Sequence, residues 1–145
     1  MIAVAKAVPE NILKDSVLNH LAAAYFSVGK QLERKTGCSS TRGFILATLR
    51  GGAPLNQNQV AKLLGFDRTV VHRTVKSLVR EGLISEQKAP TGRALLLSLT
   101  PKGNKYREQL IQARIAADEK VRQALAPKAR ATLLHLLKQL ADLKF

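Results

Sequence analysis

Apolar residues recur at helical spacing along most of the chain and alternate with polar ones in only one short region. Segments whose apolar positions return every three or four residues are 10–35, 41–50, 57–64, 68–81, 101–125 and 127–143. The period shortens to two over residues 83–88 and 94–99, which predicts two strands joined by the turn residues 89–93. Four helices, a hairpin and two further helices are typical of a winged helix-turn-helix between flanking helical segments, a mainly α fold with a small β-hairpin wing.

Cap signals set the predicted ends of the helices. Gly37 and Gly65 stand where a glycine in the left-handed conformation commonly ends a helix. Asn56, Asp67 and Thr100 have side chains that can accept a hydrogen bond from the first turn of the helix that follows each of them. The segments 57–64 and 68–81 are therefore predicted to be two helices joined by a tight turn.

The segment 68–81 has two unlike faces. Val71, Val75 and Leu78 form an apolar stripe at positions i, i+4 and i+7. The opposite face is polar and basic, and a helix of this kind suits the major groove, where arginine reads guanine and lysine or threonine holds phosphate. The predicted DNA contacts are Arg68, Thr69, His72, Arg73 and Lys76.

The predicted hairpin carries two cations near its tip, Lys88 and Arg93. A wing can place an arginine in the neighbouring minor groove, where a narrow groove concentrates negative potential. We expect Arg93 to make such a contact. For Lys88, a solvated loop charge explains the residue equally well.

The charge balance points to an acidic partner. The chain has 24 Lys and Arg against 10 Asp and Glu, a net charge of +14. The excess is +2 over residues 1–38, +6 over 39–100 and +6 over 101–145. A protein this basic commonly meets nucleic acid, although charge alone also serves solubility.

The stretch 55–84, LNQNQVAKLLGFDRTVVHRTVKSLVREGLI, together with the Leu-Thr-x-x-Gly pattern at residues 99–103, resembles the MarR family of bacterial and archaeal regulators. By element order the resemblance extends over residues 10–145. It implies a homodimer formed by the first and last two helices, binding to pseudo-palindromic DNA and, in most members, repression. In many members a small phenolic or other aromatic anion, or cysteine oxidation, releases the DNA. One departure is Thr91, where the family's wing commonly has an aspartate that orients the arginine, so the wing geometry stays open.

The resemblance divides the chain into an N-terminal dimerisation helix (1–38), a winged helix-turn-helix domain (39–100) and C-terminal dimerisation helices (101–145). An effector pocket would lie between the DNA-binding and dimerisation parts. Its candidate lining residues are His20, Tyr25, Phe44 and Tyr106, each of which would serve equally well as plain core.

Several kinds of site find no support in the sequence. Cys38 is the single cysteine, so no intrachain disulfide can form, which suits a reducing cytoplasm. Cys38 is either an oxidant sensor or a free thiol without function. His20, His72 and His135 are widely separated, and no cluster at ligand spacing predicts a metal.

Enzymatic and membrane functions are not expected either. No Gly-rich phosphate loop, G-x-S-x-G or H-E-x-x-H motif is present, so we expect neither catalysis nor a cofactor. No apolar run is long enough to span a membrane, and the first residues lack the pattern of a signal peptide. We therefore expect a cytoplasmic protein.

Three functions follow from these observations. The first is a sequence-specific, homodimeric DNA-binding regulator of transcription. The second is an architectural DNA-binding protein of low sequence preference, motivated by the positive charge outside residues 39–100. The third is a protein-interaction module that uses its charge on an acidic partner, since a fold does not fix a function.

Overall fold

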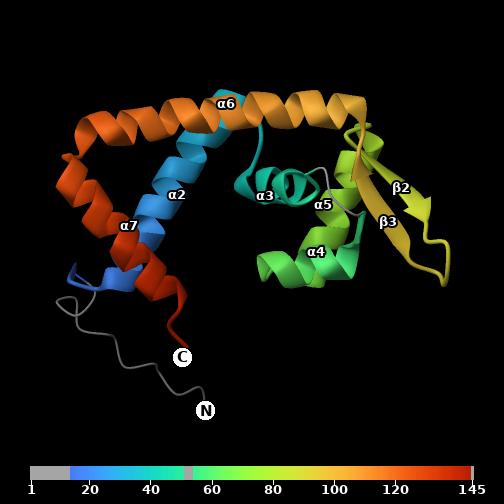
Figure 1. The fold of residues 1–145 in the computed structure, drawn as a ribbon, viewed down its shortest axis with the longest axis horizontal. Helices are drawn as coiled ribbons and strands as arrows, with labels where there is room; N and C mark the ends of the chain where they lie inside the picture. The colour runs from blue at the N-terminus through green and yellow to red at the C-terminus, as the bar shows by residue number, and fades with distance from the viewer. Residues whose placement is uncertain (1–13, 51–53, 145) are drawn as a thin grey trace, which may run out of the picture. The chain divides into compact units, whose positions relative to one another are not determined.

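The chain divides between Ser40 and Thr41 into two compact units. The computed structural model describes residues 14–50 and 54–144. These residues form six helices and a three-stranded antiparallel sheet (Figure 1). The mainly helical fold with a small β-hairpin wing is therefore confirmed.

The first unit contains helix α2 (Val17–Thr36). The sequence predicted one continuous helix from about residue 10. The structure interrupts it, because Lys14 is helical, Asp15 and Ser16 are not, and α2 begins after Ser16, whose Oγ accepts a hydrogen bond from Asn19 N at 3.3 Å. Residues 10–13 of the prediction lie outside the described residues. The predicted end is confirmed, since Gly37 has φ +68° and its N–H donates to Glu33 O at 2.7 Å.

Helices α3 (Ser40–Thr48), α4 (Gln57–Leu64) and α5 (Arg68–Arg80) supply most of the core of the second unit. Branched aliphatic side chains fill it, and removing them from water is the main stabilising contribution. The apolar stripe predicted for α5 belongs to this core. The fully buried members of the core are Ile45, Leu46, Val60, Val71, Val75, Leu78, Ile84 and Leu97.

Side-chain caps fix the turn between α4 and α5. Gln59 N donates to Asn56 Oδ1 at 2.9 Å while Asn56 N donates to Gln59 Oε1 at 2.8 Å, a reciprocal capping box at the start of α4. Gly65 ends α4 with φ +65°, and Asp67 Oδ1 accepts from Thr69 N at 2.7 Å at the start of α5. The three predicted caps are confirmed.

The sheet has the order β1-β3-β2. Strands β2 (Ile84–Lys88) and β3 (Leu95–Leu99) form the predicted hairpin. Strand β1 (Leu55–Asn56) was not predicted, because two residues show no alternation. It pairs with β3 through Leu55 and Leu97, so the backbone that leads into α4 is hydrogen-bonded to the wing.

Helix α6 (Pro101–Ala124) starts close to the hairpin, and α7 (Pro127–Ala141) follows it (Figure 1). Thr100 caps α6 by accepting a hydrogen bond from Gly103 N at 2.9 Å, and its hydroxyl donates to Gly82 O at 2.6 Å. A side chain at Gly103 would collide with the backbone of Leu83. Thr100 and Gly103 of the Leu-Thr-x-x-Gly pattern therefore allow the first turn of α6 to pack against the backbone of Gly82 and Leu83.

No helix within the described ranges is both long and apolar enough to cross a membrane.

Candidate nucleic-acid interface

Helix α5 separates its side chains into a buried and an exposed face, as its pattern predicted. Val71, Val75 and Leu78 have no exposed surface. The five predicted DNA contacts on this helix are all exposed, namely Arg68, Thr69, His72, Arg73 and Lys76. The structure thus brings them together on one helix that has its other side anchored in the core.

The positive charges of this face are not neutralised within the described part of the chain. The two ion pairs among the described residues join other side chains and leave Arg68, Arg73 and Lys76 unpaired. The nearest acid in sequence, Asp67, is used by the backbone, since hydrogen bonds from Thr69 hold the pKa of its carboxyl below the usual value. The face is therefore free to attract an anionic partner.

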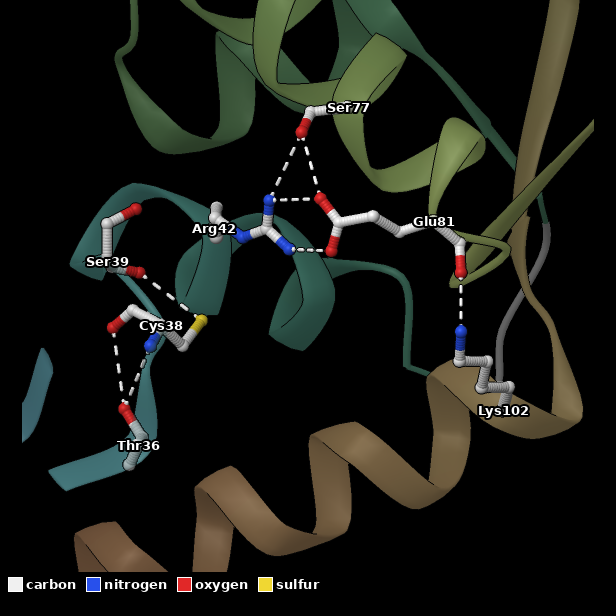
Figure 2. A network of polar contacts seen from close by, with 7 residues as sticks. All are labelled: Thr36, Cys38, Ser39, Arg42, Ser77, Glu81 and Lys102. Carbon is white, nitrogen blue, oxygen red and sulfur yellow. Dashed lines mark hydrogen bonds and ion pairs between the residues drawn. The ribbon is translucent and has the colours of Figure 1, made fainter.

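A network of polar contacts holds the far end of α5, as Figure 2 shows. The Arg42 guanidinium of α3 donates two hydrogen bonds to the Glu81 carboxylate, at 2.8 and 2.6 Å, and a third to Ser77 Oγ at 3.2 Å. Lys102 Nζ of α6 donates to the backbone oxygen of Glu81 at 2.7 Å. The end of α5 is thereby fixed to both α3 and α6.

The Arg42–Glu81 pair was not predicted from the sequence. The two residues are 39 positions apart, and no local sequence pattern around either residue indicates the other as its partner. Hydrogen bonds from Arg42 lower the pKa of Glu81 to about 2, against the opposing effect of burial. This network fixes the end of α5 without involving any of the predicted DNA contacts.

The wing presents Arg93 in the turn between β2 and β3. Ala89 N donates to Ala94 O at 2.9 Å, which closes the turn, and Gly92 takes a positive φ of +84°. Arg93 is exposed, and no described hydrogen bond or ion pair engages its guanidinium. Position 91 is a threonine, so no acid at this position can orient the arginine side chain.

His72 on the exposed face of α5 contacts Gln57, which in turn contacts Glu86, and neither of these two residues was predicted from the sequence. His72 Nδ1 lies 3.0 Å from Oε1 of Gln57, the first residue of α4. Gln57 Nε2 in turn lies 3.5 Å from Glu86 Oε1 on β2. The only available signal was the capped start of α4, which places Gln57 beside the next helix.

An open hollow of about 500 Å³ adjoins the start of α5. Lys62 and Arg68 contribute cationic groups to its lining, and Phe66 contributes an apolar wall. Arg68 is the one residue that this lining shares with the predicted DNA contacts, and the rest of the lining comes from α4, its N-cap Asn56 and the turn after it.

The four candidate effector residues lie in different surroundings. On α2, His20 is exposed with Nδ1 2.9 Å from Ser16 O, and Tyr25 meets a neighbouring phenylalanine edge to face at 5.8 Å. In the second unit, Phe44 is half-buried and meets Phe66 edge to face at 6.3 Å, while Tyr106 packs against the core. The effector pocket stays a prediction.

The described residues contain no group of three or more His, Cys, Asp or Glu that could hold a metal ion. Cys38 is buried, and its Sγ donates to Ser39 O at 3.5 Å (Figure 2). Its role as an oxidant sensor stays a hypothesis.

A helix pair with a capped turn, an exposed cationic second helix and an adjoining hairpin define a winged helix-turn-helix protein. Residues 31–94 match the model of the MarR family. The winged-helix region of the chain is therefore similar to that family.

Solved structures share this fold over nearly the whole chain. A probable transcriptional regulator from Pseudomonas aeruginosa is 28% identical, with 88% of this chain and 98% of that chain covered and a TM-score of 0.79. The PcaV transcriptional regulator from Streptomyces coelicolor is 25% identical, with coverages of 88% and 96% and a TM-score of 0.73. The repressor CouR, bound to a 23-mer DNA duplex, is 21% identical, with coverages of 92% and 98% and a TM-score of 0.80. None of the curated proteins matches the sequence significantly.

Family and fold are thus those of transcriptional regulators, which are generally not enzymes.

Proposed function

We propose that the protein is a sequence-specific, duplex-DNA-binding regulator of transcription. The observation that carries this proposal is the exposed, unpaired cationic face of α5, opposite a face that is fully buried. An α-helix fits the major groove, where Arg68 and Arg73 can read guanine edges and Lys76 and Thr69 can bind phosphates. Arg93 of the wing would reach the adjacent minor groove or its phosphates.

The proposal includes a homodimer that acts on a pseudo-palindromic operator. Large apolar side chains stand exposed on α2 and on α7, and an apolar surface of this extent is typical of an interaction surface. A second copy of the chain is the occupant we propose, because a two-fold dimer buries the same surface on both subunits and mirrors a palindromic site. The exposed residues are Val17, Leu18, Leu21, Tyr25, Phe26 and Val28 on α2 and Leu133, Leu134, Leu136 and Leu137 on α7.

We further propose repression that a small aromatic or anionic effector relieves. CouR is described as a repressor and has been solved both on DNA and with p-coumaroyl-CoA. PcaV has been solved with its natural ligand, and 6-hydroxynicotinic acid regulates the DNA binding of BpsR from Bordetella bronchiseptica. The candidate contacts in this chain are His20, Tyr25, Phe44 and Tyr106.

Selection of bound sites from random duplex DNA tests the proposal. We expect a motif with two-fold symmetry whose half-sites are about one helical turn, roughly 10 base pairs, apart. The Arg73→Ala/Lys76→Ala double variant should not enrich it. Binding without an enriched motif would support the architectural alternative instead, and failure to bind any duplex at low salt would support the protein-interaction module.

A further inference from the structure

Three polar side chains from three elements form a chain that ends at the exposed face of α5. Glu86 of β2 lies 3.5 Å from the Gln57 amide nitrogen, and the Gln57 amide oxygen lies 3.0 Å from His72 Nδ1. Gln57 lies within the capping box, between Asn56 and Gln59, that fixes the start of α4, and Glu86 pairs with Leu97 in the sheet. Gln57, which contacts the imidazole, and Glu86, which contacts Gln57, are therefore both held in place by secondary structure.

The chemistry of these groups fixes the direction of both hydrogen bonds. An ionised carboxylate can only accept, so the Gln57 group that faces Glu86 must be the amide NH₂. The group that Gln57 turns toward His72 is then its carbonyl oxygen, which also only accepts. His72 Nδ1 must therefore carry a proton and donate it, because the tautomer of an imidazole is set by the hydrogen bond that one ring nitrogen makes.

We infer that Gln57 and Glu86 hold the proton of the neutral His72 ring on Nδ1, so that Nε2 is presented to the DNA as a hydrogen-bond acceptor. The inference rests on the proposed DNA-binding function. Arg68, Arg73 and Lys76 on the same helix are donors only. His72 adds an acceptor to this face, and the base edges that can donate to it in the major groove are the amino groups of adenine N6 and cytosine N4.

Gln57 and Glu86 are thus positioning residues, and His72 is the residue that determines specificity. Their effect on the ring can be measured in the free protein by ¹⁵N correlation spectroscopy of the histidine side chains, at a pH at which imidazoles are neutral. We expect a protonated Nδ1 and a lone pair on Nε2 for His72. Gln57→Leu should move the ring toward a mixture of tautomers, whereas Gln57→Glu, which keeps an acceptor, should retain the wild-type pattern.

Glu86→Lys gives a sharper test, because a lysine only donates. It should turn the Gln57 amide around, so that NH₂ faces His72 and the ring proton moves to Nε2. Gln87→Leu is the matched control, since the neighbouring residue of a strand points to the opposite face of the sheet. Thermal denaturation of each variant checks that the fold is kept. A wild-type ring protonated on Nε2, or variant rings identical to wild type, would overturn the inference.

The second arm measures base preference on the selected operator, with each base pair of a half-site replaced in turn. Wild type should prefer an adenine or cytosine amino group at one position, by about five-fold for a single hydrogen bond. Gln57→Leu should lose that preference while keeping its preferences elsewhere, and Gln87→Leu should behave as wild type. If Gln57→Leu alters the tautomer of His72 but leaves the base preference unchanged, His72 does not determine that preference and the inference is overturned.

The two arms separate failure of this inference from failure of the proposed function. If the wild-type protein binds no duplex, the proposed function fails, and the ring-nitrogen spectra still decide the tautomer. If DNA binds specifically but the spectra show no dependence on Gln57 or Glu86, only the inference fails.

Discussion

Gly103, in the first turn of α6, packs directly against the backbone of Leu83. The Leu83 carbonyl oxygen occupies the space that a side chain at position 103 would need, and the carbonyl carbon would lie 2.9 Å from a Cβ. The same oxygen accepts a hydrogen bond from Thr100 N at 3.1 Å. The start of α6 is therefore fitted backbone to backbone onto the entrance of the wing.

We expect Gly103→Ala to lower the free energy of unfolding. A new Cβ must displace backbone rather than a flexible side chain, at a cost of about 3 kcal/mol. This exceeds the roughly 1 kcal/mol that alanine gains over glycine in a helix. Gly43→Ala on α3 is the control, because nothing lies within 4 Å of the added methyl, and it should leave stability unchanged or raise it. Urea denaturation measures both, and equal stabilities would contradict this packing.

Stability should fall in acid through Glu81. Its pKa is lowered from 4.5 to about 2 in the folded protein, so its contribution is fully present above pH 4.5 and is lost as the pH falls toward 2. Because 45% of the side chain is exposed, screening reduces the contribution to about 1 kcal/mol.

Glu81→Gln should therefore be less stable than wild type at pH 7 and nearly equal to it at pH 2. Denaturation over this pH range provides the measurement. A constant difference between the two proteins would assign the effect to packing rather than to the ion pair with Arg42.

Substitutions on the exposed face of α5 should separate base reading from phosphate binding. Arg73→Ala should cost about 1–3 kcal/mol on the selected operator and relax the preference at one base pair. Lys76→Ala should weaken binding to all DNA sequences equally and reduce the slope of log affinity against log salt concentration by about 1. Titrations at several salt concentrations measure both, with Lys120→Ala on α6 as a charge-matched control. If both variants behave like the control, another surface binds the DNA.

The wing should contribute affinity through Arg93. Arg93→Ala should weaken operator binding by about ten-fold, whereas Arg93→Lys, which keeps the charge but loses the planar guanidinium, should recover only part of it. Gel-shift titrations compare the three proteins. Full recovery with lysine would indicate a simple phosphate contact, and no loss with alanine would remove the wing from the interface.

Local signals in the sequence predicted most of the DNA-binding part. The caps Asn56 and Asp67 bond to residues two or three positions away, and the apolar stripe of α5 repeats every three or four residues. Both signals are local, so they can be recognised from the sequence alone. The pairs Arg42–Glu81 and Gln57–Glu86 could not be found in this way, because folding brings together residues 39 and 29 positions apart. The break before α2 was missed because apolar residues continue across Ser16, and only the side-chain cap of Ser16 marks the beginning of this helix.

The central position of β3 in the sheet separates the tip of the wing from the backbone that positions α4. Both edges of β3 are paired, with β1 on one side and β2 on the other, while the turn at residues 89–94 lies beyond this pairing. Substitutions, insertions or deletions in the turn leave the hydrogen bonds that set the start of α4 intact. If the proposed function holds, the tip can therefore vary between descendants and change its proposed minor-groove contact while the backbone that positions α4 and α5 is inherited unchanged.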